Sequence, residues 1–236
     1  MNVIRKLVMP AMCVLAVLAI QVFSAAPDDA PRSTAPYFTP AESSPKAPDR
    51  EGFLQRWLLL EPIDKPNRTN TVFTGTYVRN VMNTEYFPNQ FTVIPHNGDT
   101  VTVAGRELTW HALDSANFSV KLFRFAYDLN MPTYGVLFWA VTVVDSPREI
   151  KNVRMAVGSN SASMWWFNGR EAVCLFGDRR MVMDDGVSRR LKLNKGRNVV
   201  RGAVINGPGL SDFCVRFIDE SDEPIRDIML NLENAE

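Results

Sequence analysis

The pattern that most constrains this chain is a series of short apolar runs, each followed by a turn signal that contains glycine. The run Ala162–Phe167 meets Asn168-Gly169, and a second run, 171–176, follows the turn. Asn-Gly supplies the positive φ angles that a tight hairpin turn requires. This stretch therefore predicts a β-hairpin, and similar patterns predict two more, joining 91–95 to 100–103 and 189–193 to 198–205.

Further runs predict strands of two kinds. Residues 134–144 are almost continuously apolar, which is typical of a strand buried on both faces. Residues 119–127 alternate and predict a half-buried strand. Helix signals are sparse, and only 79–86 favours one or two helical turns. We therefore expect an all-β chain, a β-sandwich or jelly roll that forms a single domain over residues 51–236. The remaining strands are expected at 56–60, 153–157 and 212–218, and at 107–110 after a further turn at Ala104-Gly105.

The first 26 residues have the order of a secretory signal peptide. Arg5 and Lys6 precede an uncharged apolar stretch, Leu7–Phe23, and small residues follow it. That order predicts export, to the periplasm, the cell surface or the extracellular space, with cleavage near Ala26. The alternative is an uncleaved transmembrane anchor, which Pro10 disfavours because it interrupts the run.

Residues 27–50 contain six prolines among Asp, Ser, Thr and Ala. Such a composition favours extended chain that cannot bury a core, so we expect a Pro-rich disordered linker. It would act as a tether for the folded part, and the alternative is an unselected N-terminal tail.

Charge and cysteine content narrow the function classes. The chain carries 26 basic and 26 acidic side chains, and loss of Arg5 and Lys6 would leave a net charge of −2. This balance disfavours nucleic acid as a partner and suits neutral glycans rather than polyanions. Cys174 and Cys214 could pair in an oxidising compartment, but their apolar surroundings favour two buried thiols.

The common catalytic motifs are absent from the sequence. There is no G-x-S-x-G string, and the nearest match, 158–161, leads into a strand rather than a helix. His96 and His111 belong to no recognisable motif, and a turn or surface position is the better interpretation of both. We therefore expect no catalytic residues.

Acidic residues allow two further hypotheses. A glycosidase needs two carboxylates across a cleft, for which Asp128, Asp178, Asp184 and Asp185 are unspecific candidates. The last three could instead bind a structural calcium ion. The favoured alternative is a solvated acidic turn, balanced by neighbouring arginines at 179, 180, 189 and 190.

Adjacent tryptophans suggest a sugar platform, because flat indoles stack on the C–H faces of sugar rings. Trp165 and Trp166 lie in one predicted strand, so their side chains point to opposite faces. One can pack in the core and the other can face outward beside Asn160, Asn168 and Arg170, whose polar groups could bind hydroxyls. The alternative is that both indoles are buried.

Several strings resemble a known family. Residues 55–62 resemble the first strand of galactose-binding-like jelly-roll modules, Trp165–Arg170 (W-W-F-N-G-R) resembles their hairpin, and 184–198 resembles their acidic turn, strand and following turn. Residues 199–219, with N-G-P-G-L-S-D-F-C-V-R-F, are similar to the N-terminal module of exported acetylxylan-esterase-like enzymes of Bacteroidota. The resemblance covers residues 53–228.

The resemblance implies a β-sandwich linked to the degradation of plant polysaccharides of the xylan type. In those enzymes a hydrolase domain follows the module, and its catalytic residues have no counterparts in this sequence. We expect an exported, non-catalytic carbohydrate-binding or accessory module. The alternative is a structural or protein-interaction module that docks a separate hydrolase. Less favoured is a carbohydrate esterase or glycoside hydrolase in its own right.

Overall fold

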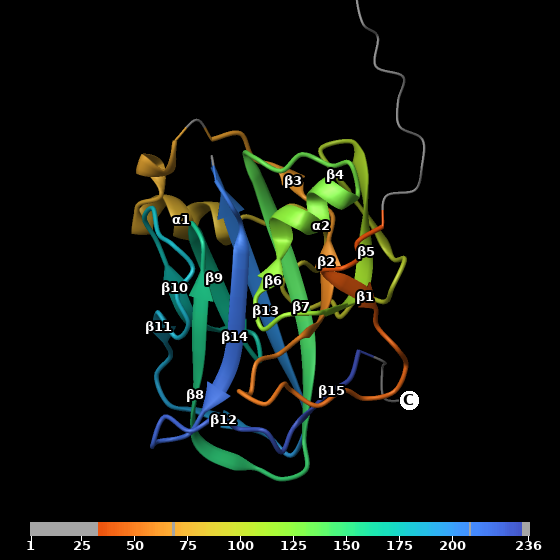
Figure 1. Cartoon of the computed structure of the whole chain (residues 1–236). Helices are drawn as coiled ribbons and strands as arrows, with labels where there is room; N and C mark the ends of the chain where they lie inside the picture. Colours follow the sequence, from red (N-terminus) through yellow and green to blue (C-terminus); the bar gives the residue numbers. More distant parts are fainter. Residues whose placement is uncertain (1–32, 68, 208, 233–236) are drawn as a thin grey trace, which may run out of the picture. The chain divides into compact units, whose positions relative to one another are not determined.

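The computed structural model describes residues 33–67, 69–207 and 209–232, and they form two antiparallel β-sheets (Figure 1). The predicted all-β sandwich is confirmed. The path through the larger sheet runs in the order β1 (Phe38–Pro40), β5 (Arg106–Ser115), β2 (Arg56–Leu60), β7 (Val136–Ser146), β13 (Gly196–Asn206), β9 (Ala162–Phe167) and β10 (Arg170–Leu175). Short strands join it at β5 and β7, namely β4 (Thr100–Val103), β3 (Ile63–Asp64) and β15 (Met229–Leu230).

The smaller sheet is built around one long pair of strands. Its order is β11 (Gly186–Val187), β8 (Ile150–Ser159), β14 (Asp212–Ile218) and β6 (Val120–Lys121), with β12 (Leu191–Leu193) also paired to β8. Strands β8 and β14 are antiparallel over the whole of β14 apart from its first residue. The helical elements are η1 (Asn70–Val72), α1 (Gly75–Met82) and α2 (Leu122–Asp128).

The first core lies between the two sheets. Side chains that alternate along β2 and β9, such as Trp57 and Trp165, meet Phe213 of β14. The ring centroids of Trp57 and Trp165 lie 6.0 Å apart, and each lies about 5 Å from that of Phe213. This aromatic contact joins the larger sheet to the smaller one.

A second core covers the other face of the larger sheet. There Leu58, Trp139 and Trp166 pack with apolar side chains of α1, and Figure 1 shows α1 beside β9 and β10. The helix begins after Thr74, whose hydroxyl accepts a hydrogen bond from the Tyr77 amide. Of the helix predicted at 79–86, α1 covers the first half, because it starts and ends four residues earlier. Because both faces are covered, the prediction of a doubly buried strand at 134–144 is also confirmed by β7.

The three predicted hairpins have different outcomes. The hairpin at Asn168-Gly169 is confirmed, because β9 and β10 pair in antiparallel register from Phe167 and Arg170. The pairing of 91–95 with 100–103 is wrong: β4 pairs with β5 across the next turn, at Ala104-Gly105. The pairing of 189–193 with 198–205 is also wrong, because the chain crosses there from the smaller sheet to the larger one.

The strand predicted at 119–127 is wrong beyond its first residues, since β6 is followed directly by α2. The apolar residues of this segment fit a helix as well as a strand. Leu122, Phe125 and Ala126 are buried at helical spacing, and the rings of Phe123 and Tyr127 stack one turn apart, with centroids 6.3 Å apart.

The described part of the Pro-rich segment belongs to the sandwich. Strand β1 pairs with β5, and Phe38 is buried. Lys46 and Arg56 both reach the carboxylate of Asp114, at 3.3 Å and 2.8 Å. The expectation of a disordered linker is therefore wrong for residues 33–50, because the domain begins before its predicted boundary at residue 51.

The predicted signal peptide, residues 1–26, lies outside the described residues. Among those that are described, no helix is long and apolar enough to cross a membrane. Cys174 on β10 and Cys214 on β14 are both free, and they belong to different sheets. The expectation of two buried thiols is met by Cys214, which is buried, whereas Cys174 is only half-buried.

Candidate functional site

The turn between β9 and β10 forms one wall of the candidate site. Asn168 and Gly169 adopt φ angles of 47° and 78°, the left-handed conformation that this tight turn requires. The turn stands beside β8 and β12 of the smaller sheet, where a cavity of about 600 Å³ opens. Its described lining comprises Lys151, Asn152, Phe167, Asn168, Arg170, Arg190, Leu191, Lys192 and Asn194.

A buried amide, Asn198, holds the two turns that border this cavity. Its Oδ1 accepts hydrogen bonds from Asn168 Nδ2 at 3.0 Å and from the Asn194 backbone amide at 2.9 Å. Its Nδ2 donates to the carbonyl oxygens of Asn194 and Gly196 at 2.9 and 3.0 Å. Sequence reasoning did not identify this residue, although its place two residues after Gly196, at the end of the string 184–198, is a signal that could have found it.

The side chain of Asn168 forms hydrogen bonds that stabilise the fold. In addition to its bond to Asn198, its Oδ1 accepts a hydrogen bond from the Val199 amide at 2.8 Å. A side-chain amide offers two N–H donors and two acceptor lone pairs, so these contacts engage one of each. Asn168 can therefore both anchor the hairpin and present polar groups to the cavity.

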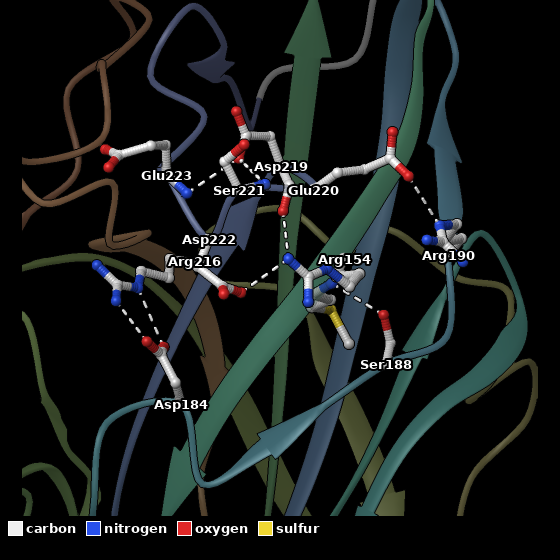
Figure 2. A network of polar contacts seen from close by, with 11 residues as sticks. Arg154, Asp184, Ser188, Arg190, Arg216, Asp219, Glu220, Ser221, Asp222 and Glu223 are labelled. Atoms are coloured by element: carbon white, nitrogen blue, oxygen red, sulfur yellow. Dashed lines mark hydrogen bonds and ion pairs between the residues drawn. The ribbon is translucent and has the colours of Figure 1, made fainter.

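Three of the cationic side chains that line the cavity, Lys151, Arg190 and Lys192, lie close to two carboxylates. Lys192 Nζ is 3.1 Å and Lys151 Nζ 3.7 Å from Glu149, and the hydrogen bond from Lys192 lowers the pKa of that carboxyl. Arg190 Nε lies 3.0 Å from Glu220, a contact that Figure 2 shows at the edge of a larger polar network. These pairs are exposed, so they remain open to competition from a ligand.

The two tryptophans do not form an open platform. Trp165 is 0% exposed and Trp166 is 6% exposed, so the expectation that one faces outward is wrong and the alternative is confirmed. The reason is the second core: the indole of Trp166 stacks on that of Trp139, with centroids 5.5 Å apart, and Phe91 packs at 5.8 Å. Trp166 does help to line a smaller cavity of about 220 Å³, with Asn83, Phe91 and Gly169.

Asn160 is not brought to the hairpin. It lies at the other end of β9, where its backbone amide donates to the carbonyl of Asp212. A six-residue strand spans roughly 20 Å, so one monosaccharide could not touch both Asn160 and Asn168. Of the five predicted binding residues, the structure places Asn168 and Arg170 together at the larger cavity.

Two of the three proposed calcium ligands, Asp184 and Asp185, form ion pairs with arginines. Asp185 accepts a hydrogen bond from Arg179 Nε at 2.9 Å. Asp184 accepts one from Arg216 Nε at 3.0 Å, as Figure 2 shows. Across the described ranges, no group of three His, Cys, Asp or Glu side chains is arranged to hold a metal ion. Of the arginines expected to balance this turn, Arg179 pairs with Asp185, whereas Asp184 pairs with Arg216. Asp178 belongs to the same connection between β10 and β11.

The residues considered for catalysis take structural positions. Ser159 is buried, and its hydroxyl lies 2.7 Å from that of Ser163. The half-buried His111 lies in the middle of β5 with its Nε2 3.1 Å from Glu61, so its expected turn or surface position is only partly right. His96 is exposed and lies 3.3 Å from Asp99, and Asp128 is buried in α2.

Comparison with known proteins gives only distant similarity. No protein-family model matches the chain, and no curated protein matches it. Among solved structures, a PA14 sugar-binding domain from an RTX adhesin is 11% identical, with a TM-score of 0.42 over 73% of this chain and 95% of that one. The PA14 domain of the antifreeze protein MpAFP is 10% identical, with a TM-score of 0.41 over 82% and 95%.

A third solved structure, the GH31 α-xylosidase from Xanthomonas citri, is 7% identical, with a TM-score of 0.27 over 81% of this chain and 18% of that one. These similarities are too low to transfer a function. The function of this chain must therefore be argued from its own residues.

Proposed function

We propose that this chain is a non-catalytic carbohydrate-binding module whose sugar site is the cavity beside the β9–β10 hairpin. The observation that carries the proposal is the lining of that cavity. Its described lining includes three residues with amide side chains, Asn152, Asn168 and Asn194, together with cationic residues and the apolar residues Phe167 and Leu191. The amide of Asn152 donates to Glu220 at 3.1 Å on the exposed surface. Planar amides and guanidinium groups can bind neighbouring sugar hydroxyls, and apolar side chains suit the C–H faces of the ring.

The size of the cavity agrees with this use. A volume of about 600 Å³ lies within the usual range for small-molecule sites. The walls come from two sheets and are fixed by buried Asn198, so the site is largely formed before a ligand arrives. A sugar would therefore lose little affinity to reorganisation of the protein.

We further propose that the natural ligand is a xylan-type polysaccharide and that the chain is exported. The resemblance over residues 53–228 supports a polysaccharide of the xylan type as the natural ligand, and the leader sequence supports export. The non-catalytic assignment is supported by the buried Ser159 and by His111, which is held within β5 beside Glu61. The purified chain is expected to leave a chromogenic acetate ester intact.

The test is calorimetry or affinity-gel electrophoresis of the folded protein against xylan, arabinoxylan and simple sugars. We expect binding to at least one of them, and we expect Asn194→Ala to weaken it about tenfold through loss of hydrogen bonds. Asn80→Ala, a change at an exposed residue of α1, is the matched control and is expected to leave binding unchanged. Absence of binding to every glycan by the folded chain would overturn the proposal.

A second candidate function is a module that docks a separate protein such as a hydrolase. One observation favours it: four large apolar side chains near the connection between β10 and β11 are between 45% and 55% exposed, namely Phe176, Val182, Met183 and Val187. Exposed apolar side chains that gather in one segment are typical of protein contacts. A pull-down would compare the wild type with Val182→Glu. If Val182→Glu loses a partner that the wild type captures, and the wild type binds no glycan, this function is favoured over the first.

A further inference from the structure

The cavity beside the β9–β10 hairpin is strongly cationic. Four of its described lining residues are basic, and the described lining contains no Asp or Glu. The basic residues come from three places along the chain: Lys151 on β8, Arg170 at the start of β10, and the neighbouring Arg190 and Lys192 at β12. The tertiary structure therefore concentrates positive charge at one site of a chain whose total charge is zero.

Neighbouring carboxylates neutralise this charge only in part. Glu149 serves both Lys151 and Lys192, and Glu220 serves Arg190. Two acidic groups thus face four basic ones, which leaves an excess of two positive charges. Arg170 has no carboxylate partner among the described residues, and it stands directly after the turn that forms one wall of the cavity.

From this arrangement we infer that the cavity binds a saccharide that carries an oxyanion, a carboxylate or a sulfate, next to its hydroxyl groups. The inference rests on the proposed function and narrows its ligand class. The guanidinium of Arg170 presents a planar pair of donors that matches a carboxylate or sulfate. Asn168 and Asn194 line the same cavity, and their amides can bind the hydroxyls of the same sugar.

This ligand class differs from the one that net charge favours. A mature charge of −2 suits neutral glycans, but a ligand responds to the local field of the site rather than to the sum over the chain. A xylan-type polysaccharide with uronic acid branches would satisfy both the resemblance and the charge of the cavity.

The test is calorimetry at low and high salt with three probes of equal length: a neutral oligomer of galactose, an oligomer of galacturonate and a sulfated oligomer of galactose. We expect at least one acidic probe to bind about tenfold more tightly than the neutral one, and the difference to shrink at high salt. Arg170→Gln is expected to remove the preference. Glu149→Gln, which frees Lys151 and Lys192, is expected to strengthen it.

Arg180→Gln is the matched control, because Arg180 is exposed but does not line the cavity. Equal binding of neutral and acidic probes, with no effect of Arg170→Gln, would overturn this inference and leave the proposed function standing. Failure of all three probes and of neutral xylan would overturn both. Binding of inorganic phosphate or single-stranded DNA as tight as that of the acidic sugars would also overturn the inference, because charge alone would then explain it.

Discussion

The side-chain amide of Asn168 donates a hydrogen bond to the side-chain oxygen of Asn198 at 3.0 Å. Asn168 borders the cavity, whereas Asn198 is fully buried at the start of the long strand β13. The same oxygen of Asn198 also accepts a hydrogen bond from the backbone amide of Asn194, which belongs to the opposite turn. One buried amide thus fixes the distance between two walls of the site without lining it.

Replacement of Asn198 should lower the stability of the fold. Asn198→Ala removes its bonds to Asn168 and Asn194 and leaves the carbonyl of Gly196 without this donor. We expect the free energy of unfolding to fall by about 2–4 kcal/mol, measured by urea denaturation. Asn80→Ala on the exposed face of α1 is the control, and its free energy should change by less than about 0.5 kcal/mol. Equal stabilities of the two variants would contradict the role of Asn198.

Gly202 is the position in β13 where a larger residue should be least tolerated. A Cβ atom there would lie 2.2 Å from Cζ3 of Trp165, which is held in the first core by Trp57 and Phe213. Gly202→Ala should lower the free energy of unfolding by about 3 kcal/mol, because the packed indole cannot move aside.

The matched control for Gly202 is Gly75→Ala at the start of α1. The nearest side chain there is that of Phe176 at 3.8 Å, an ordinary contact. This variant should be neutral or up to about 1 kcal/mol more stable, since alanine favours a helix over glycine. Thermal unfolding of both variants would measure the contrast, and a tolerated Gly202→Ala would show that Trp165 is not packed as described.

The buried ion pair of Arg56 and Asp114 should contribute strongly to the integrity of the N-terminal strands. Asp114 accepts hydrogen bonds from Arg56 Nε at 2.8 Å and Nη2 at 2.9 Å. Asp114→Asn leaves a buried guanidinium without its counter-charge, which should cost about 3–5 kcal/mol in chemical denaturation. Asp227→Asn removes the partner of Arg148 in an exposed pair and should cost less than about 1 kcal/mol. Similar losses for the two variants would refute the distinction.

Cys214 should be unreactive in the folded protein. Burial raises the pKa of its thiol from 9.0 to about 12. At about pH 8 its thiolate, the reactive form, should be roughly a thousandfold scarcer than that of an unperturbed thiol. Alkylation followed by peptide mass mapping should therefore label Cys214 slowly and faster as the pH rises. Rapid labelling at neutral pH would contradict this burial.

The same shift makes a prediction about stability. Between pH 9 and 12 the folded chain keeps the thiol proton of Cys214 and the unfolded chain loses it. The contribution of this group is therefore complete below about pH 9 and is lost as the pH rises through the folded pKa. Urea midpoints of the wild type should fall more steeply between about pH 8 and pH 10 than those of Cys214→Ser, and parallel curves would argue against the shift.

Much of the fold could be predicted from local signals. Asn168-Gly169 specifies its hairpin because the turn type depends on the φ angles of these two residues. The run that forms β7 identifies a doubly buried strand because covering both faces demands apolar side chains throughout. The segment 119–127 misled the prediction because its apolar positions satisfy both periods, and packing against the sheets decides for the helix.

The candidate site was only half predictable. Asn168 and Arg170 were identified because they lie in and directly after a recognisable turn. The burial of Trp165 and Trp166 depends on packing against β14 and against the segment around α1 and Phe91. These packing elements come from distant parts of the chain, and the residue pattern within one strand does not show which of its faces they will bury.

The sequence by itself determined most of the long strands, several of the turns and an overall charge near neutrality, because these depend on residues close together in the chain. Only the tertiary structure decided that Lys151, Arg170, Arg190 and Lys192 share one cavity and that Asn198 holds its walls. Sheet order and the crossing at Asn194 bring them together, and these depend on long-range burial that no local pattern encodes. A chain of zero net charge can therefore present a cationic site.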